Sequence, residues 1–296
     1  MTAPLVIAMP GNEFLAKPLA ALVGGDICPL ETHRFPDGET YLRLPETVKS
    51  RSVAFVCSLA NPDAKFLGLF FAARTARELG ARQIGLVAPY LCYMRQDSRF
   101  KPGEAVTSRY FASLVSDAFD WLVTIDPHLH RYKALGDIYT IPAQALHAGP
   151  LLGGWIKQHV AQPYVIGPDE ESLQWVSEVA GVCGAPYCVL HKERLGDRDV
   201  RIAPGTLKPL GPATPVLVDD VVSSGRTMQE AIRIASAFSR RRPLVAAIHG
   251  IFAEKADERL EREGARLVTT NTILHASNQI DVAPLLAPAI SGMMNR

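Results

Sequence analysis

The sequence predicts an α/β protein whose parallel sheets carry helices on both faces. Short apolar runs alternate with segments of helical periodicity, and this alternation continues along the whole chain. Strands are expected at residues 5–9, 53–57, 84–88, 121–125, 164–167, 187–190, 216–218, 244–248 and 266–269. Helices are expected near 61–80, 106–118, 171–180 and from 228 onward, the first capped by Asn61 with Pro62 in its first turn.

The length of the chain, 296 residues, predicts about two domains. A break near residues 142–152 separates halves of similar length and similar alternation, so we expect domains at 1–145 and 146–296. The last helix is expected to pack back on the N-terminal domain. Residues 203–215 contain four prolines and two glycines, and we expect them to form an exposed, irregular connection.

The composition is that of a globular protein and disfavours several classes of function. The net charge of +1 argues against nonspecific binding to nucleic acid. No apolar run approaches the roughly 18 residues of a membrane span, and the first residues lack the charged start of a signal peptide. The five cysteines, at 28, 57, 92, 183 and 188, are scattered and lack paired zinc-ligand spacing. We therefore expect buried free thiols in a cytoplasmic protein.

Polar segments follow five of the expected strands, at residues 89–100, 126–132, 168–172, 191–199 and 219–227. In open parallel sheets, ligands bind beyond the carboxyl ends of the strands. The beginnings of the strands carry no comparable chemistry. The sequence therefore predicts ligand sites at the carboxyl edges of the sheets.

Residues 215–240 carry the most informative of these segments. A strand leads into Asp219 and Asp220, a turn at 223–227 follows, and Met228, Ala231, Ile232 and Ala235 then recur at helical spacing. Backbone N–H groups at such a helix start bind anions, and Gly225 can adopt backbone angles that are strained for other residues. The pattern predicts a phosphosugar site, with the carboxylates accepting from sugar hydroxyls directly or through a metal ion. An ordinary strand–turn–helix unit is the alternative interpretation, since the segment matches neither the Walker A nor the dinucleotide motif.

The other polar segments are ambiguous when each is taken alone. Arg95 suits a bidentate phosphate contact, but an ion pair with Asp97 or Glu104 is equally simple. His128 is a metal or phosphate ligand only if a polyphosphate supplies most of the donors, because Mg²⁺ prefers oxygen ligands.

Two charged loops have comparable alternatives. Lys192 and Arg194 can neutralise charge on a transferred phosphoryl group or belong to a solvated turn. Asp37 and Glu39 lie in a tight polar turn around Gly38 and can accept hydrogen bonds from adenine or ribose, although such turns are common.

The order of the motifs is more specific than any one of them. They read Arg-Phe-Pro-Asp-Gly-Glu at 34–39, Pro-Tyr-x-x-Tyr-x-Arg-Gln-Asp at 89–97, Asp-x-His at 126–128, Pro-Asp at 168–169, Lys-x-Arg at 192–194 and Asp-Asp-x-x-Ser-Ser-Gly-x-Thr at 219–227. Together they resemble the ribose-phosphate diphosphokinase family, also called phosphoribosyl pyrophosphate synthetases. The resemblance spans nearly the whole chain, as far as Asn271 and Thr272.

The resemblance implies two domains of the type I phosphoribosyltransferase kind. It implies transfer of the diphosphoryl group of ATP to the C1 hydroxyl of ribose 5-phosphate with Mg²⁺, in a homo-oligomer that is a dimer or an assembly of dimers. The resemblance implies that Asp37, Gly38 and Glu39 bind adenine, partly in a neighbour's site, and that Arg95, Gln96 and Asp97 contact ATP. It implies that His128 and Asp169 are linked to the metal ion, and that Lys192 and Arg194 act in catalysis on a mobile loop. It also implies that Asp219 and Asp220 contact the ribose, and that the 5-phosphate is bound by Ser223, Ser224, Gly225, Arg226 and Thr227.

The chain departs from the family pattern in three places. Glu170 and Glu171 follow Pro168-Asp169, where glycines are usual, and Arg226 stands in a turn that lacks the usual acidic residue. The loop after Arg194 also lacks the usual arginine- and proline-rich sequence. Two alternative functions remain open. A phosphoribosyltransferase shares the 219–227 turn but does not account for residues 95–97, and a non-catalytic regulatory relative does not account for Lys192 and Arg194.

Overall fold

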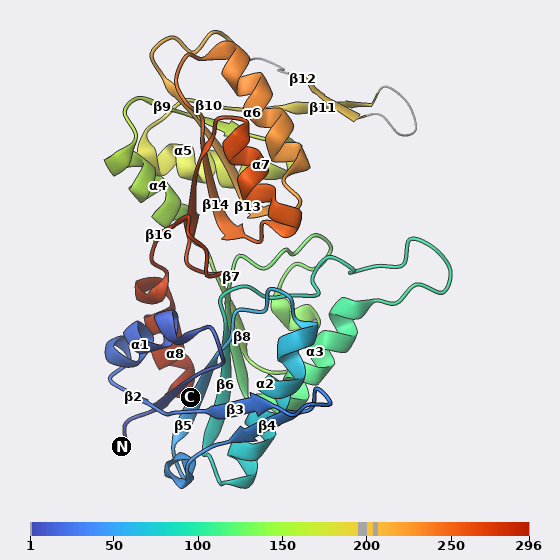
Figure 1. The fold of residues 1–296 in the computed structure, drawn as a ribbon, viewed down its shortest axis with the longest axis vertical. Coiled ribbons are helices and arrows are strands. Elements are labelled where there is room, and N and C mark those ends of the chain that lie inside the picture. The colour runs from blue at the N-terminus through green and yellow to red at the C-terminus, as the bar shows by residue number, and fades with distance from the viewer. Residues whose placement is uncertain (1, 195–199, 204–206, 296) are drawn as a thin grey trace. The chain divides into compact units, whose positions relative to one another are not determined.

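The computed structural model describes residues 2–194, 200–203 and 207–295, and its fold is drawn in Figure 1. The chain forms two compact units, each described by itself below. Unit 1 comprises Met1–Leu146 with Ala283–Arg296, and unit 2 comprises His147–Val282.

Unit 1 is built on a six-stranded, wholly parallel sheet in the order β2-β1-β5-β6-β7-β8. The strands are β1 (Leu5–Ala8), β2 (Asp26–Ile27), β5 (Ser52–Val56), β6 (Gln83–Ala88), β7 (Trp121–Ile125) and β8 (Ala143–Leu146). Helices α1 (Glu13–Leu22) and α8 (Ala283–Met294) pack together, as do α2 (Asp63–Glu78) and α3 (Thr107–Ala118). The two pairs cover opposite faces of the sheet (Figure 1). Short 3₁₀ turns lie at Glu46–Val48 and Leu135–Asp137.

Unit 2 has a second six-stranded parallel sheet, in the order β10-β9-β13-β14-β15-β16. The strands are β9 (Pro163–Gly167), β10 (Tyr187–Val189), β13 (Thr214–Val222), β14 (Leu244–Gly250), β15 (Arg266–Thr270) and β16 (Asn278–Ile280). Helix α4 (Gly149–His159) packs on α5 (Leu173–Cys183), and α6 (Arg226–Phe238) packs on α7 (Ala256–Arg262). The 3₁₀ turns Glu170–Ser172 and Ala253–Lys255 precede α5 and α7.

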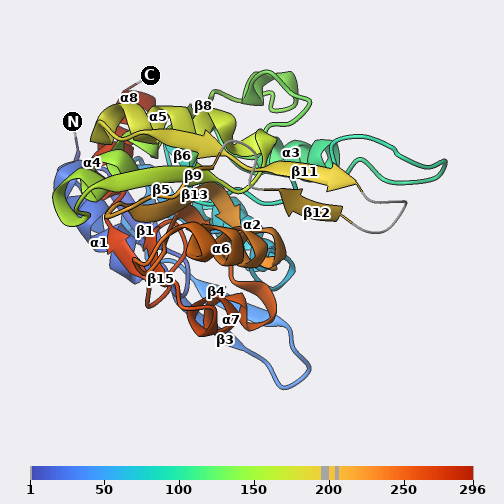
Figure 2. The same cartoon turned by 90° about the horizontal axis from the view of Figure 1, so that it is seen from above.

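The two units repeat one topology. Numbered within its own unit, each sheet has the strand order 2-1-3-4-5-6. Each also inserts an antiparallel hairpin between its second and third strands: β3 (Glu31–Arg34) with β4 (Thr40–Arg43) in unit 1, and β11 (His191–Arg194) with β12 (Val200–Ala203) in unit 2 (Figure 2). The strands β1, β5 and the helix α2 of unit 1 therefore correspond to β9, β13 and α6 of unit 2.

The central strands are buried on both faces, which is why they are readable as apolar runs. Every residue of β5, β7 and β14 is buried. In unit 1 the indole of Trp121 lies directly over Gly85, where an added Cβ would come within 1.9 Å of the ring. All nine strands expected from the sequence are present, within a few residues of their expected ends.

The structure corrects three expectations about local structure. Asn61 does not cap α2, because the helix begins at Asp63 after Pro62 and Asn61 has a positive φ of 54°. Strand β13 continues to Val222, so Asp219 and Asp220 lie within it rather than after it. The segment before β13 is not simply exposed, because Leu207 and Leu210 are buried in the core of unit 2. The expected break at 142–152 contains strand β8 and the start of α4, and the division between the two units, after Leu146, lies within it.

Candidate functional site

In unit 2, the polar groups collect where β13 extends beyond its neighbour β9. The pairing of these two strands ends at Leu217 and Ile166, so the segment from Asp219 to Val222 has no strand on that side. Chain after β9 takes its place, and Asp169 lies close enough to influence the ionisation of Asp219. The two neighbouring carboxylates of β13 each accept a backbone N–H: Asp220 N donates to Asp219 Oδ1 at 3.0 Å, and Val221 N donates to Asp220 Oδ1 at 2.8 Å.

The carboxylates of Asp169, Asp219 and Asp220, together with the turn at 223–227, are called the half-site of unit 2 below. These carboxylates repel one another. Burial, followed by the charges of Asp220 and Asp169, raises the pKa of Asp219 well above its usual value. Bringing three carboxylates together in a half-buried place is unfavourable for the empty protein. A cation or hydroxyl donors from a ligand would relieve that repulsion, so the charge distribution favours a metal-bound or sugar ligand here.

The turn after β13 has the geometry of an anion site. Ser223 and Ser224 lead to Gly225, which has φ +70° and stands at the N-cap of α6, and the helix begins at Arg226. Gly225 has no side chain with which to cap this helix start, so a ligand oxygen can accept from the first N–H groups, and the helix dipole favours an anion there. Arg226 is exposed and Thr227 is half-buried beside it. Met228, Ala231, Ile232 and Ala235 anchor the other side of the helix in the core, as expected.

Helix α7 supports this turn from behind, a feature that the sequence motifs do not reveal. Arg259 donates from Nη2 to the carbonyl oxygen of Ser224 at 2.8 Å, and from Nη1 to that of Glu254. A Cβ added to Gly225 would lie 3.1 Å from the Cβ of Ala256. The only signal in the sequence is the amphipathic pattern of α7, which does not say what the helix contacts.

The segment between β14 and α7 is strained, and it is held to the same turn. Phe252, Glu254 and Lys255 have φ values of 47°, 54° and 58°, in the left-handed region that disfavours residues with a Cβ. The N–H groups of Ile251 and Phe252 both donate to Val222 O at 3.0 Å. Strain of this kind persists only where surrounding contacts maintain it.

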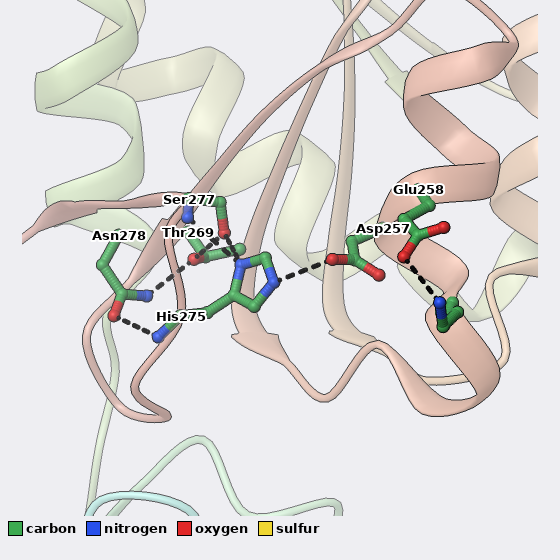
Figure 3. A network of polar contacts seen from close by, with 7 residues as sticks. Asp257, Glu258, Thr269, His275, Ser277 and Asn278 are labelled. Atoms are coloured by element: carbon green, nitrogen blue, oxygen red, sulfur yellow. Dashed lines mark hydrogen bonds and ion pairs between the residues drawn. The ribbon is translucent and has the colours of Figure 1, made fainter.

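A polar network fastens α7 to the chain between β15 and β16 (Figure 3). Ser277 N donates to His275 Nδ1 at 3.1 Å, so the proton of the neutral ring lies on Nε2, which contacts Asp257 Oδ2 at 3.1 Å. Asn278 donates to Thr269 Oγ1 at 2.9 Å and accepts from His275 N at 2.9 Å. These bonds fix the first turn of α7 and so stabilise the support that it gives to the turn at residues 223–227.

Asp169 and the two unusual glutamates form a compact turn at the end of β9. Asp169 Oδ1 accepts Glu171 N at 3.1 Å, and Ser172 N donates to Asp169 O at 3.1 Å. Asp169 is half-buried, whereas Glu170 and Glu171 are exposed. The two glutamates thus lie in a 3₁₀ turn that leads into α5.

In unit 1, the loops after β6 and β7 are joined by buried polar contacts. Gln96 Oε1 accepts from Thr107 Oγ1 at 3.0 Å, which orients its amide at the start of α3. Asp97 is buried, and its Oδ1 lies 3.4 Å from Arg131 Nε, while Tyr132 donates to the Asp97 carbonyl at 3.3 Å. Asp97 Oδ2 is buried without a hydrogen-bond partner among the residues that the structure describes. A ligand donor or cation at this oxygen would satisfy it.

Arg95 and His128 belong to the same two loops, after β6 and β7. Arg95 is exposed and His128 is half-buried, with its ring 4.5 Å from that of His130. Asp126, two residues before His128, is buried and has a positive φ of 37°. Like the segment before α7, this is a strained junction at the carboxyl edge of a sheet.

The turn at residues 35–39 is confirmed and forms the tip of the β3–β4 hairpin. Phe35 N donates to Glu39 O at 2.8 Å, and Glu39 N donates to Asp37 Oδ1 at 3.1 Å, while Gly38 has φ +94°. Asp37 and Glu39 are exposed, and the aromatic ring of Phe35 is 44% exposed beside them. The tip is therefore free to contact another molecule.

Lys192 and Arg194 were expected on a loop, but they lie on strand β11 of the second hairpin, opposite Ile202 and Val200 of β12. The charged loop expected to follow them, 195–199, lies outside the described residues. Both hairpins thus occupy the same topological position, one carrying Asp37 and Glu39 and the other Lys192 and Arg194.

Comparisons with known proteins match both units. A family model described as the N-terminal domain of ribose phosphate pyrophosphokinase matches residues 5–118, and one described as a phosphoribosyl transferase domain matches residues 136–285. The chain is 34% identical over 293 residues to a ribose-phosphate pyrophosphokinase of Methanopyrus kandleri, covering 98% of this chain and 99% of that protein. Against its counterpart in Saccharolobus solfataricus, identity is 32%, over 91% and 93% of the two chains.

The chain belongs to the ribose-phosphate pyrophosphokinase family. Its fold matches the crystal structure of phosphoribosylpyrophosphate synthetase from Mycobacterium smegmatis with a TM-score of 0.84 at 23% identity, over 99% of each chain. The expected class, two phosphoribosyltransferase-like domains with mostly parallel sheets, is confirmed for this pyrophosphokinase-family member. None of its described helices is long and apolar enough to span a membrane.

Proposed function

We propose that this chain is a ribose-phosphate diphosphokinase, which transfers the β,γ-diphosphoryl group of ATP to the C1 hydroxyl of ribose 5-phosphate. The products are phosphoribosyl pyrophosphate and AMP. The observation that carries the proposal is the half-site of unit 2, where Asp219 and Asp220 precede a helix that begins at a glycine N-cap. This arrangement occurs in a chain of the pyrophosphokinase family.

The acceptor is held by its two ends. The 5-phosphate accepts from the N–H groups and hydroxyls of residues 223–227, with Arg226 adding a positive charge. Asp219 and Asp220 accept from the ribose hydroxyls or act on them through a metal ion. Two-point binding orients the C1 hydroxyl, and orientation contributes much of the catalysis in phosphoryl transfer.

ATP is assigned to the polar loops of unit 1. Arg95 and Gln96 donate to ATP, and the unsatisfied oxygen of buried Asp97 accepts a donor or faces a cation there. Asp37, Gly38 and Glu39 bind adenine, and the exposed hairpin tip supports the proposal that they do so in a neighbouring subunit.

Mg²⁺ binding is assigned to His128 in unit 1 and to Asp169 in unit 2, in each case with phosphate oxygens as the main ligands. No group of three His, Cys, Asp or Glu side chains suited to a metal ion occurs within the described ranges. Burial and the charges of Asp220 and Asp169 raise the pKa of Asp219, and a cation near Asp169 would offset the repulsion between these carboxylates. When bound, the metal ion neutralises charge on the polyphosphate.

The chemical step forms a bond between the C1 oxygen and the β-phosphorus and breaks the bond between that phosphorus and the α–β bridging oxygen. AMP leaves with the bridging oxygen, and the hydroxyl proton passes to solvent or to the leaving group. Lys192 and Arg194 are assigned to the charge that develops on the transferred group. No covalent catalyst is required.

The enzyme is proposed to work as a homo-oligomer, a dimer or an assembly of dimers, in the cytoplasm. Leu67 and Phe71 of α2, and Tyr110 and Leu114 of α3, are exposed apolar pairs at helical spacing on two helices that pack together. Free cysteine thiols at all five positions agree with a reducing compartment.

The direct test is release of AMP by the purified protein with ATP, Mg²⁺ and ribose 5-phosphate. We expect AMP to depend on all three components and to fall strongly in Lys192→Ala. AMP at the level of the Lys192→Ala variant would refute the proposal. Release of diphosphate from phosphoribosyl pyrophosphate and a nucleobase would indicate a phosphoribosyltransferase instead.

A further inference from the structure

The loop between β6 and α3, which carries Arg95 and Gln96, contains a strained tyrosine to which the proposed reaction assigns no role. Tyr93 has a positive φ of 59°, in the left-handed region that disfavours residues with a Cβ. Its neighbours Cys92 and Met94 are both buried in the core of unit 1. The chain therefore turns at Tyr93 between two core residues, and Arg95 is the first residue after this turn that is exposed.

The side chain of Tyr93 is held by both helices that border this loop. Its hydroxyl donates to Oδ1 of Asp63, the first residue of α2. Its ring centroid lies 5.0 Å from that of Phe111 on α3, with the two planes tilted by 34°. Phe111 is buried, and its ring centroid lies 4.7 Å from that of Phe66 on α2. Tyr93 thus joins an aromatic group that α2 and α3 share.

The bond between Tyr93 and Asp63 joins a neutral phenol to a carboxylate. The hydrogen bond to Asp63 is the main cause that raises the pKa of Tyr93 to about 12, so the hydroxyl keeps its proton at neutral pH. Hydrogen bonds to a charged acceptor are stronger than neutral ones, and a carboxylate in the first turn of α2 is favoured by the helix dipole. Because Asp63 belongs to a helix and Tyr93 to a loop, the bond restrains the loop.

A second set of contacts restrains the same loop at Gln96. Gln96 Oε1 accepts from Thr107 Oγ1 at 3.0 Å, and Ser108 N donates to Gln96 O at 3.3 Å. Only two residues separate Tyr93 from Gln96. The backbone of Arg95 is therefore fixed on both sides, while its exposed side chain can reach a ligand.

We propose that Tyr93 is a positioning residue for ATP: its bond to Asp63 and its ring contact with Phe111 maintain the left-handed turn that directs Arg95 and Gln96 toward the nucleotide. A strained backbone persists only where surrounding contacts maintain it, and the hydrogen bond and the ring contact of Tyr93 are such contacts. The inference rests on the proposed function, which assigns ATP to Arg95 and Gln96.

Five variants separate the position of the loop from the stability of unit 1. Tyr93→Phe removes the hydroxyl and keeps the ring, whereas Tyr93→Ala removes both contacts and keeps the backbone strain. Tyr93→Gly removes both contacts and also the strain, since glycine adopts positive φ without a steric penalty. Asp63→Ala removes the acceptor, and Asp63→Asn keeps an amide oxygen that can accept.

Calorimetric titration with α,β-methylene ATP, in the presence of Mg²⁺ and saturating ribose 5-phosphate, measures nucleotide binding by the full-length protein without turnover. We expect Tyr93→Phe and Asp63→Ala to weaken binding of this analogue by at least about fivefold, and Tyr93→Ala by at least about tenfold. Asp63→Asn should recover part of the loss. Tyr93→Gly should have a higher Tm than Tyr93→Ala and yet bind the analogue as weakly, whereas a merely structural role would make binding follow the Tm.

Steady-state AMP formation provides the second readout. The KM for ATP should rise across the variants in the same order as the dissociation constants of the analogue. The KM for ribose 5-phosphate should not change, because the half-site of unit 2 contains neither Tyr93 nor Asp63. An equal rise of both KM values would contradict a role that is specific to ATP.

Tyr139→Phe and Asp117→Ala are the matched controls. Tyr139 is buried in unit 1, and its hydroxyl has no hydrogen-bond partner in the part of the chain that the structure describes. Asp117 on α3 is exposed and pairs with Arg74 on α2 at 3.3 Å. Neither change should alter binding of the analogue. Equal weakening by these controls, or wild-type binding in both Tyr93→Phe and Tyr93→Gly, would overturn the proposal.

Failure of the proposed function would have a different signature. Wild-type protein that does not bind the analogue, or that binds it and releases no AMP from ATP, would refute the diphosphokinase assignment. Hydrogen exchange of the amides of residues 93–97, followed by mass spectrometry without ligand, tests the position of the loop in either case. We expect faster exchange there in Tyr93→Phe and Tyr93→Gly than in the wild type, and unchanged exchange in both would overturn the positioning role.

Discussion

Gly225→Ala is the most direct perturbation of the phosphate turn, because the wild-type residue is constrained in two independent ways. Its φ of +70° lies in the left-handed region, and an added Cβ would stand 3.1 Å from the Cβ of Ala256. Both constraints act at the N-cap of α6, where the N–H groups proposed to bind the 5-phosphate must keep their direction.

The expected magnitude follows from these two terms. A residue with a Cβ in the left-handed region costs about 1–2 kcal/mol. Carbon atoms prefer separations of about 3.5–4.0 Å, so the turn or α7 must also shift by several tenths of an ångström. A total of about 2 kcal/mol, if it falls on binding, raises the KM for ribose 5-phosphate roughly 30-fold.

The assay is steady-state AMP formation with each substrate varied in turn, together with thermal unfolding. We expect a KM for ribose 5-phosphate that is at least about tenfold higher, a KM for ATP that changes little, and a Tm lowered by about 2–8 °C. Gly184→Ala is the matched control, since Gly184 has φ +68° at the end of α5 and no atom within 4 Å of its added Cβ.

The two variants separate a local effect on binding from a general effect on stability. Gly184→Ala should lower the Tm by a similar backbone cost and leave the KM values unchanged. If Gly225→Ala lowered the Tm but left the KM for ribose 5-phosphate at its wild-type value, the turn would not be the phosphate site, and the reasoning from the helix start would be wrong.

Three further predictions concern neighbouring groups. Arg259→Ala should raise the KM for ribose 5-phosphate about tenfold through the lost bond to Ser224 O, with partial recovery in Arg259→Lys and no change in Arg262→Ala; equal effects at 259 and 262 would contradict a positioning role. Asp219 holds its proton more tightly in the folded state, so its charge destabilises the fold above its raised pKa and not below the unfolded value of about 3.9. Asp219→Asn should therefore raise the Tm at neutral pH, lose that gain near pH 3, and lower kcat. A lower Tm of this variant at neutral pH would count against the predicted repulsion. Mixed oligomers of Glu39→Ala and Lys192→Ala should regain part of the activity, and failure to do so in proven mixtures would exclude a shared site.

The elements that the sequence predicted are those for which burial dictates composition. Central strands such as β5 and β14 are enclosed on both faces and must be apolar, so their runs are visible. The strands that were missed are short, lie at sheet edges or belong to hairpins. β2 has two residues, both exposed, and β3 reads Glu-Thr-His-Arg, which no pattern of burial distinguishes from a loop.

The residues of the candidate site also fall into two groups: those that a local motif predicts, and those that only the tertiary structure brings to the site. Motifs located Asp219, Asp220 and Gly225, because a strand, a turn and a helix start follow one another within a few residues. Arg259 was not predicted, because it reaches Ser224 across 35 positions from a helix without a motif of its own. Asp97 was predicted from its motif, but its burial and its contact with Arg131 depend on two loops meeting, which local spacing does not report.

The repeated topology gives a physical account of how one fold can serve both substrates. Each domain places an inserted hairpin and a helix start at the carboxyl edge of a parallel sheet. In unit 2 the strand that ends there carries two carboxylates, and their mutual repulsion favours a metal-bound or hydroxyl-rich ligand. In unit 1 the corresponding strand, β5, ends at Val56, and Cys57 and Ser58 follow it, with Lys65 Nζ donating to the carbonyl oxygen of Ser58. The same position in the fold therefore carries two carboxylates in unit 2 and a lysine in unit 1, so the two domains favour ligands of different charge there.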